Sequence, residues 1–179
     1  VVCASAPQIL NIETLESQLL SDDVGMVVGG AFSPDGTMFA VGTISGFVHL
    51  FETATMKVLF KFTVGTASVT GLAFSCSGTL LAATGEDQTV CVFDVPSRTL
   101  IYSDTMNAAG VSVALSPIMD LMAVSCDDGS VHMYDVNDLA SITPTAVVKP
   151  HTSQPGYWFR YVHCGCFLCL WSMFCLLRA

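Results

Sequence analysis

The chain has 179 residues, enough for one ordinary domain, of which 52% are hydrophobic and only 12% are charged. This composition predicts segments that are buried on both faces or nearly so. The formal net charge of −9, with six Lys plus Arg, repels phosphate backbones and argues against nucleic acid as a direct partner.

Residues 1–25 resemble the end of a structural repeat. The elements expected here are strands at 1–6, 9–14 and 17–20, followed by a solvated loop at Asp22-Asp23. The chain starts without Met, on residues that resemble the interior of a strand, so we expect it to begin inside a larger protein. Because no positively charged leader precedes an apolar run, we expect no signal peptide.

The first complete repeat spans residues 26–64. Ser33-Pro34-Asp35-Gly36 is its clearest turn signal, because Pro presets φ, Asp accepts a local backbone hydrogen bond and Gly supplies a positive φ. The strands expected in this repeat are 27–32, 38–42, 47–51 and 58–63.

Two further repeats, 65–105 and 106–149, have the same organisation. Their expected strands are 69–74, 80–84, 89–94 and 100–103 in one, and 110–115, 121–125, 130–134 and 145–148 in the other. No segment before residue 150 has a convincing helical period. Short strands separated by turn signals every 8–12 residues or so indicate an all-β sandwich or propeller.

The third strand of each repeat carries a recurring pattern in which an aromatic residue precedes an acid. The three copies begin at Val48, Val90 and Val131, so the spacings are 90 − 48 = 42 and 131 − 90 = 41 residues. A second pattern, beginning at Ala31, Ala73 and Ala114, repeats with the same spacings. Self-similarity at about 40–45 residues is typical of propeller blades. We therefore expect an all-β propeller built from four-stranded antiparallel blades.

These residues resemble the WD-repeat family. The family's Ser-Pro-Asp-Gly turn is matched in full at residues 33–36, and its Asp before the third strand is matched by Asp87 and Asp128. The Trp-Asp pair that ends the family's third strand appears here as Phe51-Glu52, Phe93-Asp94 and Tyr134-Asp135. The resemblance covers about residues 1–148 and implies a binding scaffold rather than an enzyme.

The chain also departs from the family pattern. No repeat keeps the Trp, and the family's Gly-His pair is replaced, with Asp23, Gly65 and Met106 near the position of the His. Ser45 stands where the first repeat should have its turn Asp. The His-to-Asp hydrogen-bond relay of the family is therefore incomplete, and we expect apolar burial to stabilise the blades instead.

Three repeats and part of a fourth are too few to close a propeller, which typically has four to eight blades. An open fan leaves unpaired strand edges that invite association. We therefore expect an incomplete or open propeller, which is a fragment of a longer protein or assembles with another chain that supplies the missing blades.

The cysteines of the repeats are scattered singly. We expect Cys3, Cys76, Cys91 and Cys126 to be small buried hydrophobic residues in a reducing compartment. Together with the WD-repeat resemblance, they favour an intracellular protein, with the cytoplasm as the expected location and the nucleus and cytoskeleton as open alternatives.

The tail, residues 150–179, loses the repeat and is apolar and cysteine-rich, and three interpretations stay open. A membrane helix at 157–177 would have only 14 residues, 164–177, free of charge and His, which is short of a span. A metal site would use an unusual Cys-x-Cys-x-x-Cys spacing. Its ligands would come from His163, Cys164, Cys166, Cys169 and Cys175. The third interpretation, a read-through or shifted reading frame, is favoured by the abrupt change in composition.

Acidic turns are the candidate binding residues. Equivalent turns of successive blades lie on one face, so we expect an acidic patch that would select a basic partner segment by charge. Its members are Glu86, Asp87, Asp127 and Asp128. We expect Asp87 and Asp128 to bind turn backbone N–H groups, in preference to a catalytic or metal-binding role.

An enzyme is the alternative to a scaffold that the histidines could support. His49 and His132 occupy matched positions on third strands, where the second repeat has Cys91, and we expect these side chains to point outward. Repetition at matched sites is typical of a scaffold, whereas catalysis needs different groups that converge on one pocket. We therefore expect a non-catalytic protein-binding scaffold with no cofactor and no metal. A scaffold attached to a membrane through the tail is a further alternative.

Overall fold

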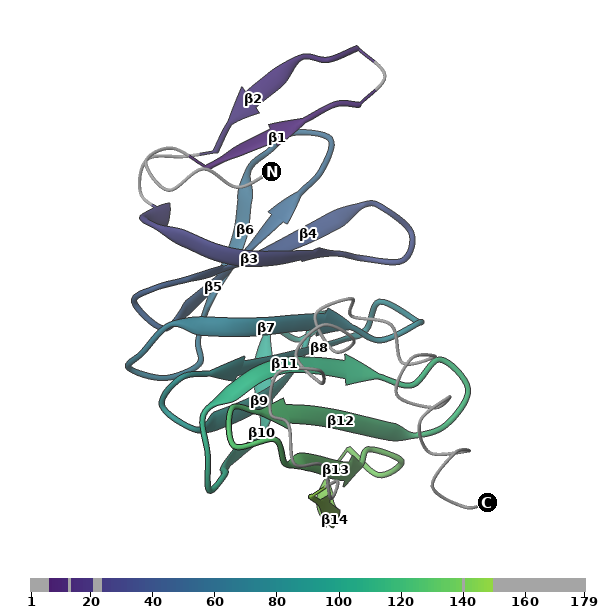
Figure 1. The fold of residues 1–179 in the computed structure, drawn as a ribbon. Helices are drawn as coiled ribbons and strands as arrows, with labels where there is room; N and C mark the ends of the chain where they lie inside the picture. Colours follow the sequence, from purple (N-terminus) through teal and green to yellow (C-terminus); the bar gives the residue numbers. More distant parts are fainter. Residues whose placement is uncertain (1–6, 13, 21–23, 140, 150–179) are drawn as a thin grey trace.

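The computed structural model describes residues 7–12, 14–20, 24–139 and 141–149. Within these residues it consists of β-strands joined by turns, arranged as one two-stranded and three four-stranded antiparallel sheets. Figure 1 shows the sheets following one another along the chain like the vanes of a fan. The all-β fold of four-stranded antiparallel sheets is therefore confirmed, and the sheets that these residues form do not close into a ring.

Each four-stranded sheet is a simple meander, in which neighbouring strands are also neighbours in sequence. The first sheet contains β3 (Val27–Phe32), β4 (Met38–Thr43), β5 (Phe47–Glu52) and β6 (Val58–Thr63). The second contains β7 (Val69–Phe74), β8 (Leu80–Gly85), β9 (Thr89–Asp94) and β10 (Thr99–Thr105). The third contains β11 (Gly110–Leu115), β12 (Leu121–Cys126), β13 (Val131–Asp135) and β14 (Thr143–Val148).

The strand bounds follow the sequence pattern closely. β3, β6, β7, β9 and β11 have the expected bounds, and the other strands of the three sheets differ by one or two residues at one or both ends. β14 starts two residues early and includes Pro144, which an outermost strand accommodates because its outer edge needs no ladder hydrogen bond.

The N-terminal hairpin is shorter than expected. It pairs β1 (Gln8–Leu10) with β2 (Ser17–Leu19). The strand predicted at 9–14 ends at Leu10, and the chain turns at Leu15, which has φ 58°. The strand expected at 1–6 and the loop at Asp22-Asp23 lie outside the described residues.

The Ser33-Pro34-Asp35-Gly36 turn forms as its residue types predict. The Asp35 carboxylate accepts hydrogen bonds from the Ser33 hydroxyl (2.6 Å) and from the backbone N–H of Thr37 (3.1 Å). These bonds hold the pKa of Asp35 below its ordinary value. Gly36 takes φ +70°, which a residue with a side chain rarely adopts.

The core lies between the sheets rather than inside any one of them. The cluster that joins the first sheet to the second includes Val48, Leu50, Phe62, Leu81 and Phe93. The cluster that joins the second to the third includes Val90, Val92, Met122, Val124 and Tyr134. Because the middle sheet contributes to both clusters, the predicted burial of segments on both faces is found there.

The third-strand aromatics anchor each sheet to the one before it. Phe51, Phe93 and Tyr134 are 0%, 2% and 1% exposed. Each lies opposite a residue of the second strand in the same register: Phe39, Leu81 and Met122, respectively. The repeated aromatic therefore has the same environment in all three sheets, and burial of each such side chain contributes roughly 2–3 kcal/mol.

Two expectations about histidines and cysteines are wrong. His49 and His132, expected to point outward, are only 5% and 6% exposed. They share a strand face with Phe51 and Tyr134, which neighbouring elements cover. Burial, and then the positive charge of Lys61, lowers the pKa of His49.

Cys76, expected to be buried, is exposed because it occupies the turn position that Pro34 has in the first sheet. Cys91 and Cys126 are buried as expected, and burial raises the pKa of both thiols. Cys3 and the whole tail, with its membrane, metal and gene-model interpretations, lie outside the described residues. In the part of the chain that the structure describes, no helix has the length and apolarity needed to cross a bilayer.

Candidate functional site

The two acidic turns lie at the same end of their sheets, which we call the acidic end. Glu86 and Asp87 connect β8 to β9, and Asp127 and Asp128 connect β12 to β13. Equivalent backbone hydrogen bonds fix the turns: the N–H of Glu86 donates to the carbonyl of Ser68 (3.0 Å), and the N–H of Asp127 donates to that of Ala109 (2.9 Å).

Asp87 is committed to local structure. Its carboxylate accepts hydrogen bonds from the backbone N–H of Thr66 (2.6 Å) and from the hydroxyl (2.5 Å) and N–H (3.3 Å) of Thr89. Asp87 therefore ties its turn to the loop that follows β6. Partial burial would raise the pKa of Asp87, but the hydrogen bonds from Thr89 and Thr66 outweigh it and the pKa lies below its ordinary value.

We expect Asp87→Ala to lower the free energy of unfolding by about 1–2 kcal/mol at neutral pH, because it leaves the donors of Thr66 and Thr89 without their acceptor. The folded-state pKa is lowered, so this contribution is present above the unfolded pKa of about 3.9 and is lost as pH falls through the folded value. Urea denaturation across pH should show the gap between wild type and variant closing in acid. Glu86→Ala is the matched control, and an equal loss from it would contradict this role.

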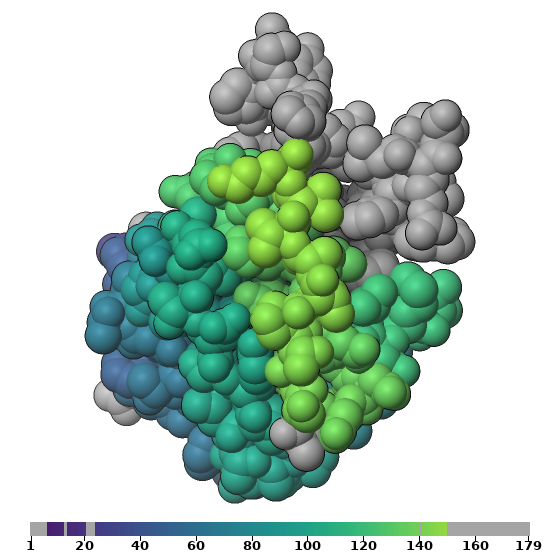
Figure 2. Space-filling model, turned by 90° about the horizontal axis from the view of Figure 1, so that it is seen from below, coloured from purple at the N-terminus to yellow at the C-terminus, as the bar shows by residue number. Residues whose placement is uncertain are grey.

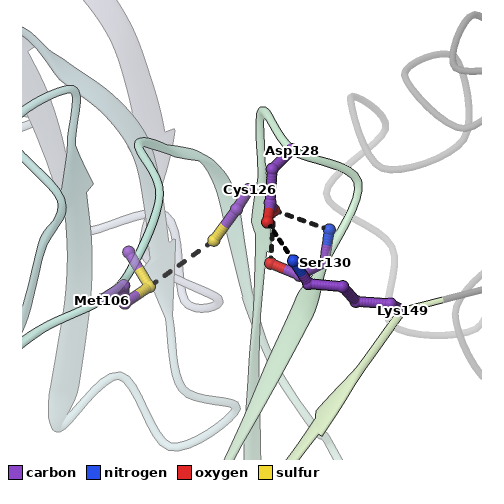
Figure 3. A network of polar contacts seen from close by, with 5 residues as sticks. All are labelled: Met106, Cys126, Asp128, Ser130 and Lys149. Atoms are coloured by element: carbon purple, nitrogen blue, oxygen red, sulfur yellow. Dashed lines mark hydrogen bonds and ion pairs between the residues drawn. The ribbon is translucent and has the colours of Figure 1, made fainter.

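Asp128 has the same local role in the third sheet (Figure 3). Its carboxylate accepts hydrogen bonds from the N–H (2.9 Å) and hydroxyl (2.5 Å) of Ser130 and pairs with Lys149 Nζ at 2.8 Å. Lys149 and then Ser130 hold the pKa of Asp128 well below its ordinary value. The ion pair is exposed to solvent and adds little stability, but it joins the turn to the end of β14.

Glu86 and Asp127 are exposed and border a groove. The first strands of the three sheets, β3, β7 and β11, lie side by side (Figure 1) and line a groove of about 990 Å³. Glu86 and Asp127 stand at its acidic end, whereas Phe32 and Phe74 stand at the other ends of β3 and β7. The groove thus has an acidic end and an aromatic end.

The wall of the groove is made of small side chains and backbone. Its residues include Gly29, Gly30, Ala31, Gly71 and Ala73. The Thr70 hydroxyl donates to the carbonyl of Gly110 (2.6 Å), which bridges β7 and β11 and fixes their spacing. The sequence predictions did not include this groove, although the Gly- and Ala-rich first strands are a signal that could have indicated it.

We call the exposed carboxylates of Glu86 and Asp127 at the groove the acidic rim. The acidic rim is confined to the second and third sheets. Ile44 of the first sheet makes the backbone hydrogen bond that Glu86 and Asp127 make in theirs, to the carbonyl of Met26 (3.0 Å). Ile44 is half exposed, and Ser45 follows it where the other sheets have Asp. The four predicted site residues are therefore divided, with Asp87 and Asp128 binding turn backbone and Glu86 and Asp127 presenting carboxylates at the rim.

The two carboxylates of the acidic rim can attract a positive charge. Among the described residues, His, Cys, Asp and Glu do not gather in threes that could hold a metal ion. The two rim carboxylates and the apolar groove beside them could receive a basic side chain and the chain that carries it.

Successive four-stranded sheets whose first strands surround a common groove define a β-propeller, and solved structures agree. The chain superposes on a chain of a crystal structure of the mitotic checkpoint complex with a TM-score of 0.75, at 16% identity, covering 84% of this chain and 48% of that one. On the Myceliophteria thermophila Cps50 (Swd1) β-propeller domain the TM-score is 0.64, at 19% identity, covering 70% and 40%.

Sequence comparison then identifies the repeat. The model of the WD domain, G-beta repeat, matches residues 56–94, which run from the end of the first sheet through β9. The chain therefore carries a WD repeat within a β-propeller fold and is similar to WD-repeat proteins, as its turns and third-strand aromatics predict.

The chain is also similar in sequence to several curated proteins. Cleavage stimulation factor subunit 50 of Arabidopsis thaliana is 26% identical, covering 73% of this chain and 34% of the relative. Autophagy-related protein 16 of the same plant is 30% identical, covering 68% and 24%. THO complex subunit 3, also from that plant, is 31% identical, covering 55% and 31%. The chain thus spans about a quarter to a third of the length of these relatives.

Proposed function

We propose that this protein is a non-catalytic WD-repeat scaffold that mediates protein–protein interaction within a larger assembly. The main support for this proposal is the different roles of the four acidic residues. Asp87 and Asp128 accept hydrogen bonds from backbone N–H groups, whereas Glu86 and Asp127 face solvent at the groove. The names of two relatives, a cleavage stimulation factor subunit and a THO complex subunit, describe components of assemblies.

The organisation proposed for the chain is that of a propeller fragment. Residues 1–25 end one blade, residues 26–64, 65–105 and 106–149 form three complete blades, and residues 150–179 are a separate tail. The further blades come from a longer polypeptide or from another chain. Single free thiols at Cys76, Cys91 and Cys126 support an intracellular, cytoplasmic location, because reducing compartments preserve them.

The partner class that fits the acidic rim is a basic protein segment. Glu86 and Asp127 occupy equivalent places in neighbouring sheets, so a segment that crosses both sheets would meet two carboxylates in succession. The apolar groove beside them offers contact to the rest of such a segment. The net charge of −9 favours the approach of basic partners and disfavours nucleic acid.

The test is binding of a fluorescent Lys/Arg-rich peptide, measured by anisotropy at low and at physiological salt. Glu86→Gln combined with Asp127→Asn should weaken binding by about 10-fold at low salt, with a smaller effect once salt screens the charges. Asp120→Asn is the matched control, since Asp120 is exposed in the turn at the opposite end of β12. Equal affinity of the double variant and the control for the peptide would reject the acidic rim as the binding site.

A further inference from the structure

The N-terminal hairpin has one covered face and one open face. Ile9 packs against the cluster around Phe51 of the first sheet. Leu10 and Leu19 lie on the opposite face and are 43% and 60% exposed. Ile12, which follows β1 at the position corresponding to the third-strand aromatic, is 83% exposed. We call Leu10, Ile12 and Leu19 the leading face.

The third sheet has an open apolar face at the other end of the fan. Ala114 and Ala123 pack there with Leu121, Val131 and Met133, which are only partly buried. The corresponding residues of the other sheets are covered by the sheet that follows. These are Val48 and Leu50 in the first sheet and Val90 and Val92 in the second, and their exposure is 0–2%. We call the face of the third sheet the trailing face.

The outermost strand extends the trailing face. Val131 is paired with Val148 and Met133 with Ala146, so these side chains of β14 share the face. Figure 2 shows the yellow-green β14 running across the surface of the molecule. The side chains of β14 are exposed except for the partly buried Val148.

The two open faces match each other in kind. Each interface between complete sheets contains an aromatic pair, Phe62 with Phe93 (4.5 Å between ring centroids) or Tyr102 with Tyr134 (5.9 Å). The positions in β14 that correspond to Phe60 and Phe62 of β6 hold Ala146 and Val148. The leading face likewise presents Leu and Ile in place of the aromatic. The leading face and the trailing face are therefore both aliphatic surfaces.

We propose that the occupant of these faces is a second copy of this chain, bound with the leading face of one copy on the trailing face of the other. This rests on the proposed function, in which the open fan needs further blades. Two such contacts, related by a twofold axis, would close a ring of two chains. The chain covers 48% and 40% of two propeller chains, so two copies supply close to one whole propeller. Two copies together supply six four-stranded sheets and two hairpins, which lies within the usual range of about four to eight blades.

The experiment measures the mass of the full chain by sedimentation under reducing conditions over a range of concentrations. We expect a dimer of about twice 19.0 kDa. Ile12→Asp on the leading face and Ala146→Asp on the trailing face should each weaken self-association by about 100-fold, because each buries an unpaired carboxylate in the contact. Ile118→Asp is the matched control: Ile118 is 76% exposed in the turn after β11, and its replacement should leave the dimer intact.

A mixture of the two variants tests the head-to-tail geometry. Each variant keeps one functional face, so neither should self-associate, but an equimolar mixture should form a dimer through one contact. Unchanged circular dichroism and urea midpoints for both variants show that they are folded. A monomer at every concentration, or a dimer that neither variant affects, would overturn the second-copy proposal. Peptide binding at Glu86 and Asp127 by a monomer would leave the scaffold proposal standing.

Discussion

Phe93→Ala is expected to lower the free energy of unfolding by about 3–5 kcal/mol, the largest effect of any single replacement that we predict. The ring is 2% exposed and lies 4.5 Å, centroid to centroid, from Phe62 of the preceding sheet. Its loss leaves a cavity in the cluster that joins the first two sheets, where Leu50 and Leu81 cannot close it because each is held in its own strand ladder. Since domains are stable by only about 5–15 kcal/mol, the variant should be close to unfolding.

Phe32→Ala is the matched control for this prediction. Phe32 is also an aromatic residue in a strand of a complete sheet, but it is 58% exposed at the aromatic end of the groove. Its replacement should lower the free energy of unfolding by less than about 1 kcal/mol. Urea denaturation followed by far-ultraviolet circular dichroism gives both values, and similar losses for the two variants would show that Phe93 does not anchor the sheets.

Gly46→Ala is expected to lower the free energy of unfolding by about 3 kcal/mol through two separate causes. Gly46 has φ +82°, and an L-residue in the left-handed region costs roughly 1–2 kcal/mol. A Cβ at this position would also collide with the backbone carbonyl of Gly65, and overpacking of this kind costs roughly 1–3 kcal/mol. To remove this collision, the loop after β6 would have to move. A hydrogen bond from the N–H of Val64 to the carbonyl of Gly46 (2.9 Å) holds that loop in place.

Gly36→Ala separates the two causes. Gly36 has φ +70° in the turn between β3 and β4, but a Cβ there would meet no atom within 4 Å. This variant should therefore show only the conformational cost, about 1–2 kcal/mol. Thermal unfolding of both variants alongside wild type measures the difference. A loss for Gly36→Ala as large as that for Gly46→Ala would mean that the turn before β5 does not pack against the loop after β6.

Much of the fold could be predicted because the same physical requirements recur at each repeat. The aromatic that becomes Phe51, Phe93 or Tyr134 must fill the space beside the preceding element, so it returns at a fixed spacing. Turn residues such as Asp35 and Gly36 are required by the turn itself, which needs a side-chain acceptor and a positive φ. Requirements of this local kind can be predicted from sequence. The bounds of β14 were less accessible, because its exposed side chains place few demands on residue type.

The errors arose where burial depends on a neighbouring sheet. Alternation along a strand assigns His49 and His132 to the face opposite Val48 and Val131, but it does not say that both faces are covered. In a stack of sheets an apparently outward residue is interior, which the alternation of a single strand does not reveal. Cys76 differs from its expected burial for the opposite reason, because its residue type predicts burial whereas its position in a turn exposes it.

The four acids of the candidate site could be predicted from sequence, together with the role of two of them. Sequence identifies Glu86, Asp87, Asp127 and Asp128 and predicts that Asp87 and Asp128 bind turn backbone N–H groups. The donors are the backbone N–H groups of Thr66 and Ser130, and sequence does not indicate Thr66, which lies 21 residues from its acceptor. The groove was not predicted either, because it forms only where the first strands of separate repeats come together.

The most direct test of the stacked-sheet account is a set of nuclear Overhauser contacts between aromatic rings of different sheets. The account predicts cross-peaks between Phe62 and Phe93 and between Tyr102 and Tyr134, whose ring centroids are 4.5 and 5.9 Å apart. These pairs join residues of separate repeats, so no single sheet could produce them. Contacts confined within each repeat, with neither of these cross-peaks, would contradict the account that successive sheets stack face to face.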